Sequence, residues 1–228
     1  METRAVIFDL FATLVPTFAQ PAHDRVLEQI AELLGAPVEG FVKLWTEHYA
    51  LRATGGVGIE GCIATIADRL GSSASDPQIR DAMELRLANA RESMRPRPDA
   101  VSTLHALRRR GLRTGLISDC SPEPSMVWSE TPFAPLIDVV VFSCIEGVCK
   151  PDPRLYLSAC ERLGVDPGEC LFVGDGGSSE LSGAAAVGMS AIQLLAFEGP
   201  DEPIGYGDVR EAWDGPKVKS LTELVSIV

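Results

Sequence analysis

The sequence predicts an α/β fold in which a doubly wound, Rossmann-like parallel sheet carries an inserted α-helical cap domain. Two observations lead to this expectation. After residue 95, short apolar runs alternate with helical patterns, as in repeated βαβ units. Before residue 95, four helical patterns follow a single strand, with no convincing strand among them. We therefore expect a core domain made of residues 1–15 and 95–228, and a helical cap domain made of residues 16–94.

The first strand is expected at residues 5–8, an apolar run that ends at the charged Asp9, as a buried strand with a polar tip does. Apolar residues then recur at helical spacing in four segments. Their apolar faces are Val26, Ile30 and Leu34; Phe41, Leu44 and Trp45; Ile59, Ile63, Ile66 and Leu70; and Ile79, Met83 and Leu87. Gly35 ends the first segment, and Asp76 with Pro77 begins the fourth as an N-cap followed by proline.

The second part of the chain opens at Pro96 and Pro98, which we interpret as a hinge. Strands and helices alternate after it. The expected strands are residues 114–117, 138–142, 170–173 and 191–195, and the expected helices are residues 101–107, 153–163, 179–187 and 221–228. Strands that are joined through helices lie parallel, so these elements predict a sheet covered by helices on both faces.

The composition restricts the possible partners. The formal net charge is −12, which argues against nucleic acid, because binding to a phosphate backbone needs clustered lysine and arginine. The basic run at residues 108–110 is interpreted as a helix C-terminus that Gly111 stops. No apolar segment is long enough to predict a membrane span. The six cysteines include no CxxC pair and no leader precedes the first strand, so we expect no zinc site and a cytoplasmic protein with reduced thiols.

Chemically active residues follow the ends of the predicted strands. In chain order they are Asp9, Ser118, Asp119, Lys150 and Asp175. Ligand sites of open α/β sheets lie beyond the carboxyl ends of the strands, so we expect these side chains at one rim. A carboxylate such as Asp9 can attack a phosphoryl group or a carbon and form a covalent intermediate that water later opens. The sequence therefore predicts a hydrolytic site at this rim.

Four segments in this order resemble the motifs of the haloacid dehalogenase (HAD) superfamily. They are residues 8–15 for motif I, 116–119 for motif II, 150–153 for motif III and 172–181 for motif IV. The resemblance covers nearly the whole chain, and the four helices stand in the position of the C1-type cap of subfamily I. It implies a hydrolase, and we expect a phosphatase that acts on a small phosphorylated metabolite as a monomer or homodimer.

The resemblance also implies a role for each motif residue. Asp9 would be the nucleophile, Ser118 would hold the transferred group, and Lys150 would bridge Asp9 and the substrate anion. The implied cofactor is Mg²⁺, which prefers hard oxygen ligands. The implied metal ligands are Asp9, the backbone carbonyl of Phe11, Asp175 and, directly or through water, Glu180.

Three further residues are expected to bind the substrate. Thr13 belongs to the segment that resembles motif I, and Asp119 to the segment that resembles motif II. Arg52 lies near the end of the second predicted cap helix, and it is our candidate cap contact for an anionic substrate group.

Phe11 departs from the phosphatase pattern, because HAD phosphatases carry a second aspartate at this position as general acid and base. Such a group is worth about 10²–10⁴-fold in rate. An aromatic residue here, as tyrosine, is typical of 2-haloacid dehalogenases, which need no metal but usually have Ser-Ser-Asn where this chain has residues 173–175. A metal-independent dehalogenase and a weakly catalytic small-molecule-binding protein therefore stay as alternatives. Asp119, a cap residue and water are the candidates for the missing acid and base.

Overall fold

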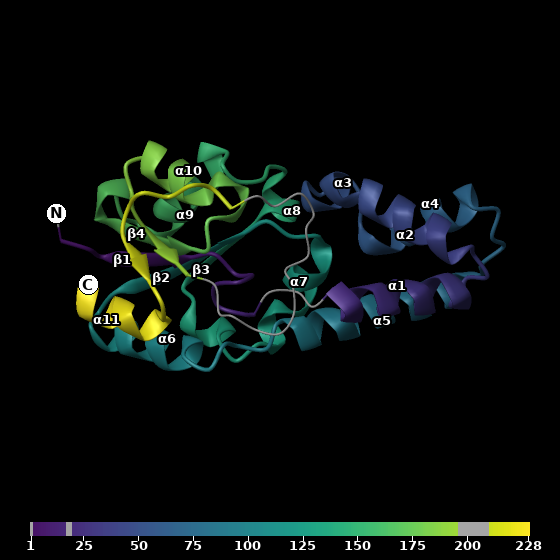
Figure 1. Ribbon diagram of the computed structural model, residues 1–228, viewed down its shortest axis with the longest axis horizontal. Helices are drawn as coiled ribbons and strands as arrows, with labels where there is room; N and C mark the ends of the chain where they lie inside the picture. The colour runs from purple at the N-terminus through teal and green to yellow at the C-terminus, as the bar shows by residue number, and fades with distance from the viewer. Residues whose placement is uncertain (1, 17–19, 196–209) are drawn as a thin grey trace.

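A computed structural model describes residues 2–16, 20–195 and 210–228 of the protein. Its centre is a six-stranded sheet in the order β3-β2-β1-β4-β5-β6, with every neighbouring pair parallel (Figure 1). The strands are β1 (Ala5–Phe8), β2 (Arg113–Ser118), β3 (Val139–Phe142), β4 (Cys170–Gly174), β5 (Ser190–Leu194) and β6 (Lys217–Val218). The strand order reverses beside β1, as in a doubly wound sheet.

Helices cover both faces of this sheet. The α-helices of the core domain are α6 (Ala100–Arg109), α7 (Pro122–Val127), α8 (Ser143–Glu146), α9 (Pro153–Leu163), α10 (Glu180–Ala186) and α11 (Leu224–Ile227). Side chains of β1 alternate between the two faces, because successive residues of a strand point in opposite directions. Val6 and Phe8 belong to the apolar cluster shared with α6 and α11, whereas Ala5 and Ile7 belong to the cluster shared with α9 and α10.

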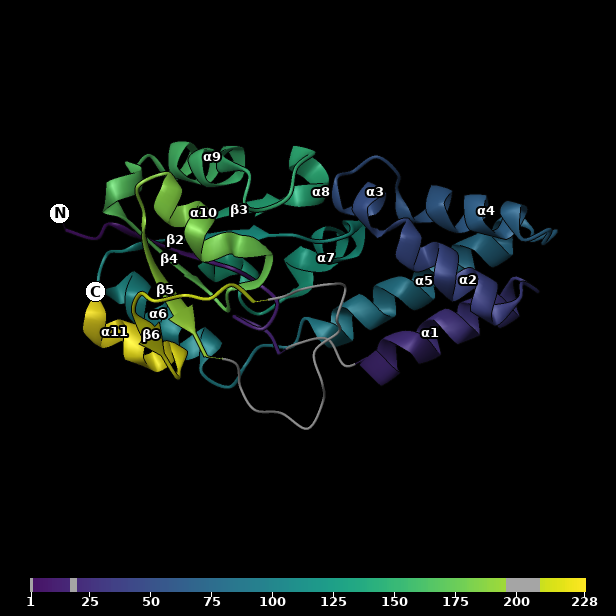
Figure 2. The same ribbon diagram turned by 45° about the horizontal axis from the view of Figure 1, so that its top comes forward.

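Five helices form a block beside the sheet. They are α1 (Gln20–Leu33), α2 (Val38–Glu47), α3 (Tyr49–Ala53), α4 (Ile59–Arg69) and α5 (Asp76–Ser93). The block lies at the opposite end of the molecule from the N-terminus, beyond the carboxyl ends of the strands, and α1 runs alongside α5 (Figures 1 and 2). Ser75 and Gln78 form a capping box that fixes where α5 begins, so the N-cap is Ser75 and the predicted N-cap, Asp76, is the first residue of the helix.

The predicted fold class is confirmed: the parallel sheet is doubly wound and a helical cap domain is inserted after its first strand. The division into residues 1–15 with 95–228 and residues 16–94 stays a prediction. No helix of the described segments is long and apolar enough to cross a membrane.

Several short elements were not predicted. The edge strand β6 has two residues, which is too short to show a periodic pattern. The helices α7 and α8 follow strand ends, and α3 follows α2 after His48 alone. The expected terminal helix at 221–228 begins as a 3₁₀ turn, Leu221–Glu223, before α11.

Candidate active site

The parallel register of the central strands brings the predicted site residues to one rim. Phe8 of β1 pairs with Leu116 of β2 and with Val173 of β4. The backbone N–H of the next residue, Asp9, continues the ladder by donating to the carbonyl of Val173 at 2.9 Å. Asp9, Ser118 and Asp175 therefore stand side by side at the carboxyl ends of three neighbouring strands, and all three are buried.

Lys150 reaches this rim from the loop between α8 and α9. Its backbone N–H donates to Oδ1 of Asp119 at 2.9 Å, so the residue after Ser118 fixes where the lysine backbone lies. Its Nζ donates to Oδ1 of Asp9 at 2.6 Å and also to Oε2 of Glu180. The ammonium group thus joins the end of β1 to the start of α10.

Three carboxylates meet beside Lys150. One oxygen atom from each of Asp9, Asp175 and Glu180 lies within 4.8 Å of the other two, and the three residues are buried. Backbone N–H groups orient two of them: Gly177 donates to Oδ1 of Asp175 at 3.1 Å, and Gly176 donates to Oε1 of Glu180 at 3.0 Å. A cluster of buried carboxylate oxygens of this kind could hold a divalent cation.

Gly174 makes this cluster sterically possible. A Cβ atom at this position would lie 2.0 Å from Oε1 of Glu180, so any side chain would displace that carboxylate. The backbone nearby is also strained. Ala12, Ser178 and Ser179 have φ values of 59°, 53° and 52°, and these are the non-glycine residues with positive φ in the described segments. All three flank Asp9 or Asp175, and such strain is typical of functional loops.

Burial and the neighbouring charges shift the pKa values of these residues. Burial raises the pKa of Asp9 to about 6, although Lys150 lowers it, and Asp175 raises it further. Burial and the neighbouring Asp9 likewise raise the pKa of Glu180 well above its usual range. Burial alone would lower the pKa of Lys150, but Asp9 and Glu180 raise it well above the usual range. Burial and mutual repulsion thus disfavour the charged forms of Asp9 and Glu180, whereas the two carboxylates favour the charged form of Lys150.

Among the predicted site residues that the structure describes, two buried hydroxyl groups lack a hydrogen-bond partner. They are Oγ of Ser118 and Oγ1 of Thr13, both on residues that were predicted for the site. Buried polar atoms of folded proteins are nearly always paired, so such exceptions need an explanation. A ligand with oxygen atoms at this rim would satisfy the Ser118 hydroxyl, since the residue ends β2 beside Asp9.

Phe11 brings no acid or base to the rim. Its side chain is half-buried and packs against the larger apolar cluster of the core. Its backbone carbonyl lies two residues after Asp9 in the same loop. Asp119 is half-buried, and its Oδ1 is engaged by the Lys150 backbone.

Arg52 lies inside the cap. It is buried, and its Nη1 donates to the carbonyl of Trp45 at 2.7 Å while its guanidinium stacks 3.8 Å from the centre of the Trp45 ring. None of the contacts described for Arg52 joins it to Asp9, Lys150 or Asp175. Its expected role as a contact for substrate is therefore untested, and its described interactions are those of a residue that packs the cap.

Sequence reasoning missed two features near the site. Arg210 donates from Nε to Oδ2 of Asp175 at 2.9 Å, although it lies 35 residues further along the chain. Arg86 of α5 pairs with Glu123 of α7, with 3.0 Å between Nε and Oε1, and both side chains are buried. Neither arginine belongs to a motif, so only the tertiary structure reveals them.

Known proteins of two activities are similar in sequence to this chain. An (S)-2-haloacid dehalogenase 4A of Burkholderia cepacia is 28% identical over 208 residues, which are 87% of this chain and 86% of the relative. A phosphatase of Mycobacterium tuberculosis is 30% identical over 203 residues, which are 84% of this chain and 87% of the relative.

The solved structures show the same fold. A HAD family enzyme of Bacteroides thetaiotaomicron, in complex with magnesium and inorganic phosphate, aligns with a TM-score of 0.65 and 17% identity. The alignment covers 87% of this chain and 97% of that protein. The family model for haloacid dehalogenase-like hydrolases matches residues 3–188. With most of its length matched and the four motif segments gathered at one rim, this chain belongs to the haloacid dehalogenase-like hydrolase family.

Proposed function

We propose that this hydrolase is a Mg²⁺-dependent phosphatase of small phosphorylated metabolites, with Asp9 as its nucleophile. The observation that carries the proposal is the buried cluster of Asp9, Asp175 and Glu180. Its three carboxylates outnumber the two side-chain cations that contact them, Lys150 and Arg210, and burial holds the pKa values of Asp9 and Glu180 above their usual range. A divalent cation would remove this excess, and carboxylate and carbonyl oxygens are the ligands that Mg²⁺ prefers.

The donor set fits such an ion. Asp9, Asp175 and Glu180 would supply carboxylate oxygens, and the backbone carbonyl of Phe11 would supply a neutral one. The phosphatase of M. tuberculosis and the magnesium and phosphate complex of the B. thetaiotaomicron enzyme support the same assignment. When bound, Mg²⁺ would offset the charge on the oxygens of the transferred phosphoryl group.

The protein's own residues would carry the remaining chemistry. A carboxylate oxygen of Asp9 attacks phosphorus, the bond from phosphorus to the leaving oxygen breaks, and an acyl phosphate forms on Asp9. The leaving alkoxide takes its proton from water or a neighbouring acid, because Phe11 has none to give. Water then attacks the acyl phosphate, which releases inorganic phosphate and restores the Asp9 carboxylate.

Other residues would position the substrate during these steps. The Nζ of Lys150 already contacts Asp9, so it can hold a phosphoryl oxygen close to the nucleophile. The unpartnered hydroxyl of Ser118 would donate to a second phosphoryl oxygen. Asp119 would act indirectly by fixing the Lys150 backbone. Roles for Thr13 and Arg52 in substrate binding stay predictions.

A metal-independent 2-haloacid dehalogenase is the second candidate. The aromatic Phe11 after the nucleophile and the dehalogenase of B. cepacia favour it. In that reaction Asp9 would attack the carbon that bears the halogen and release a halide ion, and water would then open the resulting ester. The acidic residues Asp175 and Glu180 would have no metal to hold.

One experiment separates the two candidates. Phosphomonoesters and 2-haloacids are supplied to the wild-type protein and to an Asp9→Asn variant, each with Mg²⁺ and with EDTA. We expect phosphate release that is lost both with EDTA and in the variant. Halide release that persists in EDTA would replace the phosphatase proposal with the dehalogenase. If the wild type turned over neither class, while ligand binding persisted in Asp9→Asn, the protein would be a binding protein.

A further inference from the structure

Arg210 contacts one of the carboxylates that the proposed function assigns to the metal. Its Nε donates to Oδ2 of Asp175 at 2.9 Å, and the side chains are 37% and 10% exposed. The other oxygen, Oδ1, accepts from the backbone of Gly177. Both carboxylate oxygens of Asp175 are therefore engaged by donors from the protein. An oxygen that accepts from a guanidinium shares its lone pairs and its charge with a cation.

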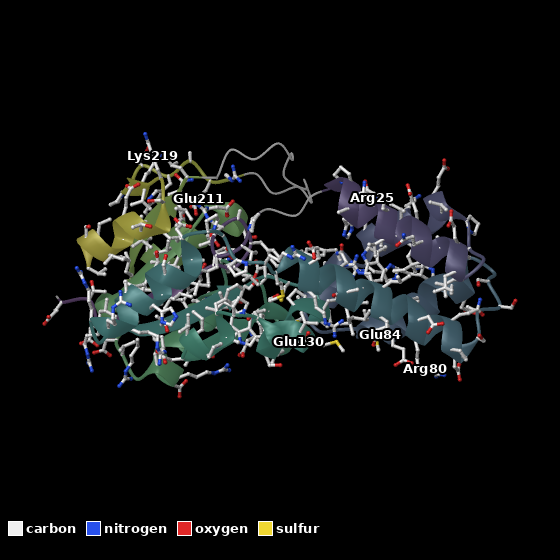
Figure 3. All side chains as sticks on the ribbon, turned by 90° about the horizontal axis from the view of Figure 1, so that it is seen from below. Arg25, Arg80, Glu84, Glu130, Glu211 and Lys219 are labelled. Atoms are coloured by element: carbon white, nitrogen blue, oxygen red, sulfur yellow. The ribbon has the colours of Figure 1, made fainter. Side chains whose placement is uncertain are left out.

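The neighbouring residue anchors Arg210 to the motif IV loop. The backbone N–H of Glu211 donates to the carbonyl of Gly176 at 2.9 Å. The Glu211 carboxylate accepts from the backbone N–H of Leu181 at 2.7 Å and also bonds Ser182 at the start of α10. Glu211, labelled in Figure 3, lies on the α/β part of the molecule, away from the cap. The contact of Arg210 with Asp175 is thus held in place by the neighbouring hydrogen bonds of Glu211 and is not an isolated ion pair at the surface.

Electrostatics makes arginine and metal mutually unfavourable at Asp175. Two positive charges that share one carboxylate repel each other, and each lowers the negative charge that the other meets. The site without metal holds three buried carboxylates, Asp9, Asp175 and Glu180, with Lys150 and Arg210 as the cations in contact with them. Arg210 therefore supplies part of the charge that a divalent cation would supply.

We propose that Arg210 is a competitor of the divalent cation: it closes the Asp175 ligand position when metal is absent and leaves it when Mg²⁺ binds. This inference rests on the proposed function, since it assumes that Asp175 is a metal ligand. Arg210 thereby weakens Mg²⁺ binding and keeps the acidic cluster folded and partly neutralised without metal. Arg210 is a positioning residue in this scheme, because it acts through Asp175.

The test is Mg²⁺ binding to the metal-stripped full-length protein, measured by isothermal titration calorimetry with MgCl₂ alone. Exposed ion pairs contribute about 0.2–1 kcal/mol, which corresponds to about a 1.4- to 5-fold change in a binding constant. We expect Arg210→Gln to bind Mg²⁺ about two- to fivefold more tightly than wild type.

Arg4→Gln is the matched control. This variant also removes one charge from a partly exposed ion pair, in which Nη1 of Arg4 lies 3.2 Å from Oε1 of Glu169. Arg4 precedes β1 and so lies at the opposite end of the strand from Asp9. Its Mg²⁺ affinity should equal that of wild type. A second readout uses the unaltered protein: the ¹⁵N NMR signal of the Arg210 Nε–H should shift toward that of a solvent-exposed arginine as MgCl₂ is added.

The outcomes distinguish this inference from the proposed function. Equal Mg²⁺ affinity in wild type and Arg210→Gln, with an unmoved Arg210 signal, would overturn the competition and leave the metal site standing. Weaker binding in Arg210→Gln would overturn it as well, because the arginine would then support the site. Absence of Mg²⁺ binding in both proteins would overturn the metal site itself, and the competition with it.

Discussion

The buried ion pair between Arg86 and Glu123 joins the cap to the core. Arg86 lies on α5 and Glu123 on α7, which follows the end of β2, and the side chains are 5% and 1% exposed. The Arg86 guanidinium also donates toward Nδ1 of His23 at 3.4 Å and lies 4.9 Å from the centre of the Trp45 ring. Replacing Arg86 by methionine keeps much of the apolar volume and removes the charge.

The expected cost follows from the burial of Glu123. Burial by itself raises the pKa of Glu123, but Arg86 reverses this and holds the pKa below its usual range. Without Arg86 the carboxylate would be buried with its main partner gone, and breaking a buried pair in this way costs about 3–5 kcal/mol. This is a large part of the total stability of a typical protein. We therefore expect Arg86→Met to lower the free energy of unfolding by about 3–5 kcal/mol at pH 7.5.

The stability loss caused by Arg86→Met should depend on pH in a definite direction. In Arg86→Met, burial would raise the pKa of Glu123 above its value in the unfolded chain. A group with a raised pKa in the folded state contributes stability at low pH and loses it as the pH rises. The difference between wild type and Arg86→Met should consequently be smaller at pH 5 than at pH 7.5.

Urea unfolding followed by tryptophan fluorescence and circular dichroism measures these values. The double variant Arg86→Met with Glu123→Gln should recover part of the loss, because no unpaired charge remains. The matched control is Arg91→Met, which removes the exposed pair between α5 and Glu130 and should change stability far less. Glu130, labelled in Figure 3, lies where the cap meets the α/β part. Strictly additive single variants, or equal losses at both pH values, would refute this reasoning.

Three further predictions follow from individual contacts. Burial and Arg86 lower the pKa of His23 to about 4, so this histidine should cost up to about 3 kcal/mol of stability as the pH falls from about 6.5 to about 4. In urea unfolding, His23→Gln should therefore show a flatter dependence of stability on pH. An unchanged dependence would contradict the assignment. Gly174→Ala should displace Glu180, which lowers the free energy of unfolding by about 1–3 kcal/mol and weakens Mg²⁺ binding in calorimetry. Wild-type values for the stability and the Mg²⁺ affinity would show that the loop relaxes around the added methyl group. Phe11→Asp should raise the turnover of alkyl phosphomonoesters by about 10²–10⁴-fold in a phosphate-release assay, and no increase would mean that another group already supplies the proton.

The sequence by itself determined five of the six strands and the order in which the site residues follow their ends. Buried parallel strands are continuous apolar runs, so residues 5–8 and 170–173 were recognisable without partners. Their polar tips, Asp9 and Asp175, follow from the same pattern, because parallel strands end at a common edge. Local signals also placed the start of α5 to within one residue, since Pro77 lies in its first turn, although the N-cap is Ser75 and not Asp76.

The tertiary structure decided which charges meet. Arg210 and Asp175 are separated by 35 residues, and Arg86 and Glu123 by 37, and no local pattern relates the members of either pair. Arg52 illustrates the same limit: its position in the sequence does not reveal that its guanidinium stacks on Trp45 inside the cap. Periodicity reports which face of an element is apolar. The partner of a charged side chain depends on how separate elements pack, and that information exists only in the folded chain.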